Sequence, residues 1–259
     1  MIDSMQIAAT GMQAQEKAIS TIAHNLSNLN TPGFKKTQVR FADMMHNALA
    51  RAGQGALVEG QGTAYGLGSM VASEVKVFTQ GAIETTGREL DVAIRGPGFL
   101  EVRMADGERA YTRAGSLVLD ANRMLTTPSG EALTPSIEIP LDSEAVIIGS
   151  DGTVEARIAG EDEPVTLGRL ELVRFSNPGG LEPIGQNLYL PTLEAGDMLY
   201  SEPGQDGSGL LAQGYLETSN VEMVDELTRL LTAQRAYELN ARVIQASDEL
   251  LAIVNNMRR

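Results

Sequence analysis

The chain has 259 residues, 42% of them hydrophobic, which is enough to bury the core of one large or two modest domains. Its 34 acidic and 20 basic residues give a formal net charge of -14, and the basic residues are scattered, so nucleic acid and acidic substrates are disfavoured as partners. The absence of cysteine excludes disulfides, thiol catalysis and thiolate metal sites.

An amphipathic helix is predicted from Met1 to about Asn28. Asp3 and Ser4 favour its start, and the turn-forming residues that include Pro32 end it. Gly11 weakens its middle by about 1 kcal/mol relative to alanine. Apolar residues recur along it at a spacing of seven, in two lines that include Met5, Met12, Ile19, Ile22 and Leu26.

Residues 31–69 are predicted to form an extended connector. Val39, Phe41, Met44 and Met45 are compatible with a short helix, whereas Arg51–Gly68 is rich in Gly, Ala and Gln and shows no period. Its Gly-x-Gly groups lack the Gly-x-Gly-x-x-Gly spacing and a following Gly-Lys-Ser/Thr, so they do not indicate a nucleotide site.

Short strands dominate residues 70–219. Leu90, Val92 and Ile94 alternate with other residues, and turn signals such as Pro97-Gly98 and Asp151-Gly152 separate the runs. Because no helical pattern intervenes, we predict a mainly antiparallel β domain, either a sandwich or an irregular barrel.

A second long helix is predicted from Asn220 to Met257, extending roughly 55 Å at 1.5 Å per residue. Asn220 is its expected N-cap, and Asp225 and Glu226 suit its first turns. The apolar stripe is narrow, which favours coiled-coil packing over one wall of an ordinary core, and the N-terminal helix is the expected partner. The residues expected to face partners are Met223, Leu227, Leu230, Tyr237, Ile244 and Leu251.

No constellation of catalytic residues is evident. The two histidines, His24 and His46, have no metal-binding spacing, and no Gly-x-Ser-x-Gly elbow occurs. Acidic pairs such as Asp142 and Glu144 are explained by solvated loops. We therefore expect no catalytic, cofactor or metal site. No apolar run reaches the length of a membrane span, and the first residues lack the pattern of a signal peptide, so neither membrane insertion nor a cleaved leader is expected.

Three stretches resemble the flagellar rod and hook family of axial proteins. Residues 24–36, His-Asn-Leu-Ser-Asn-Leu-Asn-Thr-Pro-Gly-Phe-Lys-Lys, resemble its N-terminal signature and depart from it at His24 and Ser27. Residues 90–99 and 111–115 are similar to its central signature, and residues 213–221 and 234–240 to its C-terminal one. The resemblance therefore extends over effectively the whole chain, and residues 213–221 and the chain length favour a subunit of the distal rod.

The resemblance implies an α+β protein with long coiled-coil-like helices at both ends and a central, mainly antiparallel β domain. Residues 1–30 with 220–259 would form a helical polymerisation core and residues 70–219 the β domain. The implied function is that of a non-enzymatic subunit that self-assembles into a hollow helical shaft in the periplasm-spanning basal body and transmits torque from motor to hook. The implied partners are copies of the chain, proximal rod and hook-side axial proteins and surrounding ring proteins, and the implied route is flagellar type III export. We expect the terminal helices to order only on assembly.

Two alternatives remain at this stage. One is a proximal rod paralogue of the same family. The other, from a different class, is a cell-wall glycan hydrolase that uses its helical ends only for docking, which would require a cleft with two close carboxylates.

Overall fold

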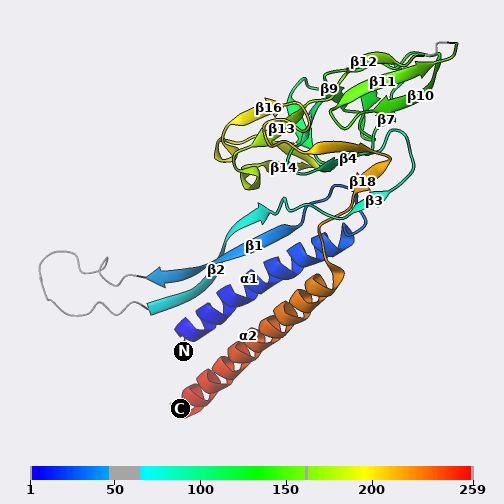
Figure 1. Ribbon diagram of the computed structural model, residues 1–259. Helices are drawn as coiled ribbons and strands as arrows, with labels where there is room; N and C mark the ends of the chain where they lie inside the picture. The colour runs from blue at the N-terminus through cyan, green and yellow to red at the C-terminus, as the bar shows by residue number, and fades with distance from the viewer. Residues whose placement is uncertain (1, 47–64, 161–162, 258–259) are drawn as a thin grey trace, which may run out of the picture. The chain divides into compact units, whose positions relative to one another are not determined.

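The computed structural model describes residues 2–46, 65–160 and 163–257, with one long helix near each end of the chain and strands between them (Figure 1). The chain forms two compact units. The first comprises Met1–Ser27, Thr37–Val75 and Glu222–Arg259, and the second comprises Asn28–Lys36 and Lys76–Val221. Each unit is therefore built from segments that are distant in sequence.

The first unit contains two antiparallel helices, α1 (Ile2–Ser27) and α2 (Met223–Met257). Asn25 of α1 lies beside Glu226 of α2, and Gly11 lies beside Asn240, so the two helices run in opposite directions. The N- and C-terminal ends consequently lie at the same end of the pair (Figure 1). The predicted pairing of the two terminal helices is confirmed.

A two-stranded sheet completes the first unit, formed by β1 (Thr37–His46) and β2 (Tyr65–Lys76), with β1 beside α1. The short helix suggested by residues 39–45 is therefore wrong. The Asn25 side chain accepts a hydrogen bond from Thr37 N and donates one to Thr37 O, both at 2.9 Å, which holds the start of β1 extended. Of the predicted connector, residues 47–64 lie outside the described residues, and Tyr65–Gly68 belong to β2.

The predicted N-cap of the C-terminal helix is also wrong, because α2 begins only at Met223. The backbone N–H of Glu226 donates to the carbonyl of Glu222 at 3.0 Å, which places the first helical turn after residue 220. The side chain of Asn220 instead bonds Lys36 and Thr79 of the second unit. Asn220, a residue type that often caps helices, thus forms hydrogen bonds with distant segments instead.

The second unit is a β domain, and every strand pairing recorded for it is antiparallel. Its sheets are β14-β15-β6-β5-β9-β8-β7, β10-β11-β12, and the pairs β13-β16, β17-β4 and β18-β3. The strands are β3 (Ile83–Thr85), β4 (Val92–Arg95), β5 (Leu100–Arg103), β6 (Arg109–Thr112), β7 (Val118–Leu119), β8 (Leu125–Thr126), β9 (Ala132–Thr134), β10 (Ser143–Ile148), β11 (Thr153–Ile158), β12 (Val165–Arg169), β13 (Leu172–Phe175), β14 (Glu182–Gly185), β15 (Leu188–Leu190), β16 (Met198–Ser201), β17 (Leu210–Gln213) and β18 (Tyr215–Glu217). The prediction of an α+β protein with a central antiparallel β region is confirmed.

Two clusters form the core of this domain. The larger one is aliphatic and gathers alternate residues of many strands, among them Val92, Val102 and Leu172. The smaller one is aromatic: Phe99 and Tyr111 each pack edge to face on Phe175, with ring centroids 5.5 and 4.9 Å apart respectively. Aromatic residues are few in this chain, and their concentration here makes this cluster a rigid anchor for β5, β6 and β13.

Tight turns occur where the sequence predicted them. Gly96 and Gly98, between β4 and β5, have φ values of 113° and 145°, which side-chain-bearing residues rarely adopt. Asp151-Gly152 forms the turn between β10 and β11. The chain reversal at Gly96 also brings backbone carbonyl groups close together, and these accept hydrogen bonds from the guanidinium of Arg113.

Candidate functional site

The helix pair contains the residues predicted to mediate assembly, and these residues differ in exposure. Ile22 is buried and Met223, Leu227 and Tyr237 are exposed. The remaining members are half-buried: Met5, Met12, Ile19, Leu26, Leu230, Ile244 and Leu251. The predicted set is therefore only partly buried in the single chain.

The buried face of α2 includes small and polar residues beside the predicted apolar positions. A line of residues spaced by seven runs along this face. It consists of Glu226, Ala233, Asn240 and Ser247. Ala233, Glu226 and Ser247 are buried. One line of residues on the buried face of α2 is therefore small or polar, and this line contributes little apolar burial.

Gly11 explains how the helices approach closely. A Cβ atom at this position would lie 2.8 Å from Asn240 Nδ2, closer than side chains normally approach. The glycine that lowers helix propensity therefore creates the space that the Asn240 amide occupies. Its neighbours on the buried face, Ala8 and Ala14, are also small.

Asn25 connects three elements of the first unit. In addition to its two bonds with Thr37, its Nδ2 atom donates to Glu226 Oε2 at 3.2 Å. Glu226 is 1% exposed, and its Oε1 atom has no hydrogen-bond partner among the described residues. The nearest cation is Arg229, with Nη1 3.7 Å from that oxygen. One oxygen of this buried carboxylate thus retains hydrogen-bonding capacity.

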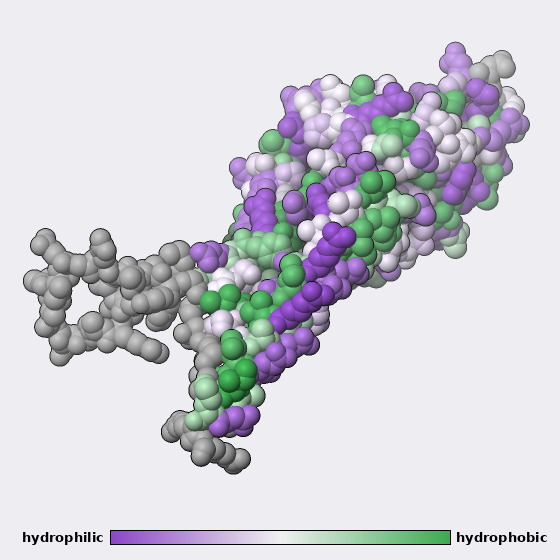
Figure 2. Space-filling view, turned by 90° about the horizontal axis from the view of Figure 1, so that it is seen from below, coloured by the Kyte–Doolittle hydropathy of each residue, from purple (hydrophilic) through white to green (hydrophobic). Residues whose placement is uncertain are grey.

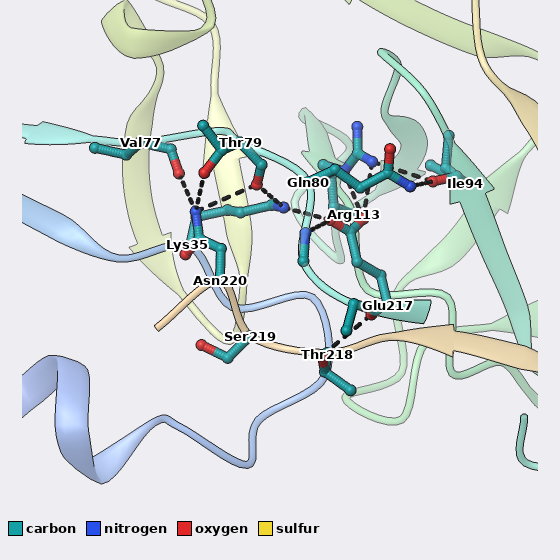
Figure 3. A network of polar contacts seen from close by, with 12 residues as sticks. Lys35, Val77, Thr79, Gln80, Ile94, Arg113, Glu217, Thr218, Ser219 and Asn220 are labelled. Atoms are coloured by element: carbon teal, nitrogen blue, oxygen red, sulfur yellow. Dashed lines mark hydrogen bonds and ion pairs between the residues drawn. The ribbon is translucent and has the colours of Figure 1, made fainter. Parts of the chain in front are cut away.

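The second unit contains a network of buried charges, drawn in Figure 3, which we call the ionic clamp: Lys35, Arg113 and Glu217. Arg113 donates from Nε and Nη2 to Glu217 Oε2 at 2.9 and 2.8 Å. The other carboxylate oxygen accepts from Lys35 Nζ at 2.5 Å and from Gly81 N at 2.8 Å. Both oxygens of Glu217 are therefore saturated with donors.

The two cations of the clamp also bind backbone carbonyls. Arg113 donates to the carbonyls of Gly96 and Gly98 at 2.9 Å and to that of Ile94 at 3.2 Å. Lys35 Nζ donates to the carbonyl of Thr79 at 2.7 Å. Burial lowers the pKa of Lys35 below its ordinary value, and the neighbouring carboxylate of Glu217 acts in the opposite direction.

Backbone and amide bonds join the same segments around the clamp. Asn220 Oδ1 accepts from Lys36 N at 2.8 Å. Asn220 Nδ2 donates to the carbonyl of Val77 at 2.7 Å (Figure 3). Gly33, at a φ of 70°, donates its N–H to the carbonyl of Glu217 at 2.7 Å. The clamp and these bonds thus connect three segments of the second unit: residues 28–36, 76–81 and 217–220. In the sequence, each segment is next to a boundary between the second unit and the first.

Sequence reasoning named the motifs around these residues without assigning them a role. Lys35 and Glu217 belong to the N- and C-terminal signatures, and Arg113 to the central one. The sequence signal for a buried charge was a charged residue beside a turn or an apolar residue. Lys35 follows Gly33-Phe34, and Glu217 ends a short strand. Their partnership could not be derived, because Arg113 and Lys35 are 104 and 182 residues away from Glu217.

Known proteins match this chain over nearly its full length. Three family models match: the flagella basal body rod protein at residues 5–35, the flagellar hook protein FlgE/F/G D1 domain at 93–156, and the flagellar basal body rod FlgEFG protein C-terminal at 212–257. The flagellar basal-body rod protein FlgG of Buchnera aphidicola (Schizaphis graminum subspecies) is 42% identical over 254 residues, covering 97% of this chain and 98% of its own. The chain belongs to the flagellar basal-body rod protein family.

Relatives from distant bacteria agree with this assignment. FlgG of Borreliella burgdorferi is 41% identical and FlgG of Bacillus subtilis 36% identical, each over 100% of both chains. Family membership makes the chain a component of the flagellar basal body that assembles with other axial flagellar proteins. Among the described residues, no helix is both long and apolar enough to cross a membrane.

Proposed function

We propose that the chain is a structural subunit of the distal rod of the bacterial flagellar basal body. In this proposal it polymerises into a hollow helical shaft that transmits torque from the motor to the hook. The observation that carries the proposal is the similarity to FlgG over the whole chain, which includes both terminal helices and the β domain. The relatives favour neither the proximal rod paralogue nor the glycan hydrolase, and no catalytic step is proposed.

The polymerisation core is proposed to be the helix pair, residues 1–30 with 220–259. Its predicted contacts are the interface residues named above, of which Met223, Leu227 and Tyr237 are exposed in the single chain. Residues 31–69, which include β1 and the first part of β2, would connect the core with the β domain of residues 70–219. The glycine-rich part of this connector, residues 51–68, falls largely on residues outside the described ones.

Order in the helices is proposed to accompany assembly. The seam between α1 and α2 is partly small and polar, and much of the apolar surface of α2 remains exposed, so an isolated pair buries little. Figure 2, viewed from the side of α2, shows apolar residues between hydrophilic rows along the helical unit. Since isolated helices depend on packing for most of their stability, contacts with neighbouring copies would supply what the single chain lacks.

The β domain is proposed to form the rigid outer layer, and the ionic clamp to hold the segments through which load enters it. The proposed partners are further copies of the chain, proximal rod and hook-side axial proteins, and the rings around the rod. We further propose delivery by flagellar type III export without a cleaved signal peptide, and a site that uses no cofactor or metal.

Deletion of Met223–Arg259 tests the proposal. The shortened chain should fail to polymerise while near-ultraviolet circular dichroism still reports a folded β domain. Hydrogen exchange on the full chain gives the companion measurement: α1 and α2 amides should exchange fast in dilute monomer and slowly in polymer. Polymerisation by the shortened chain, or slow exchange throughout both helices in the monomer, would contradict it.

A further inference from the structure

A continuous ridge of exposed side chains runs along α2. Residues spaced by four lie in one row on a helix surface, and such rows are the ridges that pack into grooves of neighbouring elements. In this row the apolar members are 41 to 60% exposed. The α2 ridge consists of Met223, Leu227, Leu231, Arg235, Leu239 and Val243. It is apolar except for one cation near its centre.

Arg235 has no ion pair within the part of the chain that the structure describes. A guanidinium between apolar neighbours hinders burial of the ridge unless the receiving surface presents a carboxylate. The charge therefore restricts which surfaces can accept the ridge.

A groove of matching character lies in the first unit. It has a volume of about 460 Å³ and is bounded by α1, β1 and the first turns of α2. Its lining includes the apolar residues Ala18, Ile22, Val39 and Phe41, and polar side chains between them that include Glu226 and Arg229. Glu226 is the buried carboxylate whose Oε1 atom lacks a hydrogen-bond donor. Arg229 Nη1 lies 3.7 Å from Oε1, beyond hydrogen-bond distance, so the groove offers apolar surface and one acceptor without a hydrogen bond, and the ridge is apolar with one donor.

The ridge and the groove cannot meet within one molecule. Glu226 and Arg235 are carried by the same continuous helix, where nine residues correspond to a rise of about 13.5 Å, and the side chains leave the axis in nearly opposite directions. The partner that brings a second ridge to this groove is therefore a second copy of the chain.

We propose that the α2 ridge of one copy packs into the groove of the next copy, with Arg235 donating to Glu226 of its neighbour. This inference rests on the proposed function and specifies which two surfaces meet. Because the two surfaces differ, the contact is head-to-tail, and a head-to-tail contact that does not close generates an open helical polymer. The charge pair sets the register of the apolar ridge in the groove.

Cross-linking of two single-cysteine variants tests the pairing directly, since the chain has no cysteine of its own. One variant carries Thr232→Cys at the groove and the other carries Leu239→Cys on the ridge, and tags of different mass distinguish them. Both positions are exposed, so both proteins should fold. After equal mixing and treatment with a short bis-maleimide, the mixed groove–ridge adduct should exceed either like-with-like adduct at least tenfold. Asp248→Cys in place of Leu239→Cys is the matched control and should give no excess.

The outcomes separate this proposal from the proposed function, because polymer formation is followed independently by electron microscopy without cross-linker. Polymers without an excess of mixed adduct overturn the ridge–groove contact and leave the rod function intact. Like-with-like adducts in excess would show a symmetric contact and also overturn it, as would occupation of the groove by a different protein. Mixed adducts that stop at short oligomers support the contact and contradict the rod.

Charge reversal gives a second test. Arg235→Glu should raise the concentration threshold for polymerisation at least tenfold, because it places two carboxylates together, and Arg235→Lys should raise it less. Arg242→Glu makes the same charge change about 10 Å further along the same face of α2, beside the ridge, and should change the threshold less than threefold because the proposed contact places Glu226 opposite position 235 alone. Equal effects of Arg235→Glu and Arg242→Glu would contradict the pairing.

Discussion

Glu217→Ala is the sharpest test of the ionic clamp. The substitution removes the acceptor of four hydrogen bonds and leaves Lys35 and Arg113 buried without a counter-charge. Breaking a buried ion pair in this way costs about 3–5 kcal/mol. The carbonyl partners of both cations remain, yet carbonyls carry no net charge and cannot replace the carboxylate.

Urea unfolding of the β domain measures this cost. The chain has no tryptophan, so near-ultraviolet circular dichroism of the buried tyrosines Tyr111 and Tyr189 is the signal of choice. With a slope of about 2 kcal/mol per M, a loss of about 4 kcal/mol lowers the urea midpoint by about 2 M. Lys35→Met keeps the pair of Glu217 with Arg113 and should cost less, about 1–3 kcal/mol.

Arg169→Ala is the matched control in the same domain. Arg169 pairs with Glu202 at 2.5 Å and with Asp151 at 3.7 Å, and all three side chains are between 41 and 56% exposed. Solvent screens such pairs, so their loss should cost less than about 1 kcal/mol and move the midpoint by less than about 0.5 M. A Glu217→Ala midpoint no lower than that of Arg169→Ala would refute the stabilising role of the clamp.

Three further predictions concern other parts of the chain. Gly11→Leu should raise the polymerisation threshold at least about tenfold, because it displaces Asn240 from the helix seam, and Asn240→Ala in the same chain should recover part of the loss. Asn25→Ala should raise that threshold about thirtyfold, equivalent to about 2 kcal/mol, because buried Glu226 loses its donor; sedimentation of polymer measures both thresholds. Burial raises the pKa of Tyr111 above its ordinary value of 10.0, so the folded domain keeps a proton that the unfolded chain releases, and stability present below pH 10.0 declines above it. Urea midpoints at about pH 9 and about pH 11 should therefore converge in Tyr111→Phe relative to the unmodified chain.

Local patterns were sufficient for much of the architecture. Both terminal helices follow from apolar residues repeated along the chain, and the β domain follows from alternation and from turn residues such as Gly98 and Gly152. These features depend on neighbours a few residues away, so they are visible in one sequence. The family signatures carried the functional assignment for the same reason, since they are contiguous.

The errors occurred where a distant segment supplied the hydrogen bonds. Residues 39–45 form part of a strand because β2 pairs with it and Asn25 holds its first residue, and Asn220 does not cap α2 because Lys36 and Thr79 occupy its amide. Local propensity is a fraction of a kcal/mol per residue, and a saturated set of tertiary hydrogen bonds outweighs it.

The sequence by itself determined most element types, the two terminal helices and the family of this protein, because periodicity and contiguous motifs are local properties. The tertiary structure alone decided that Lys35, Arg113 and Glu217 share one buried site, that Gly11 admits Asn240, and that one oxygen of buried Glu226 has no hydrogen-bond partner among the described residues. The physical reason is that burial removes water as a partner for charged and polar groups, and only the folded chain determines which distant groups replace it.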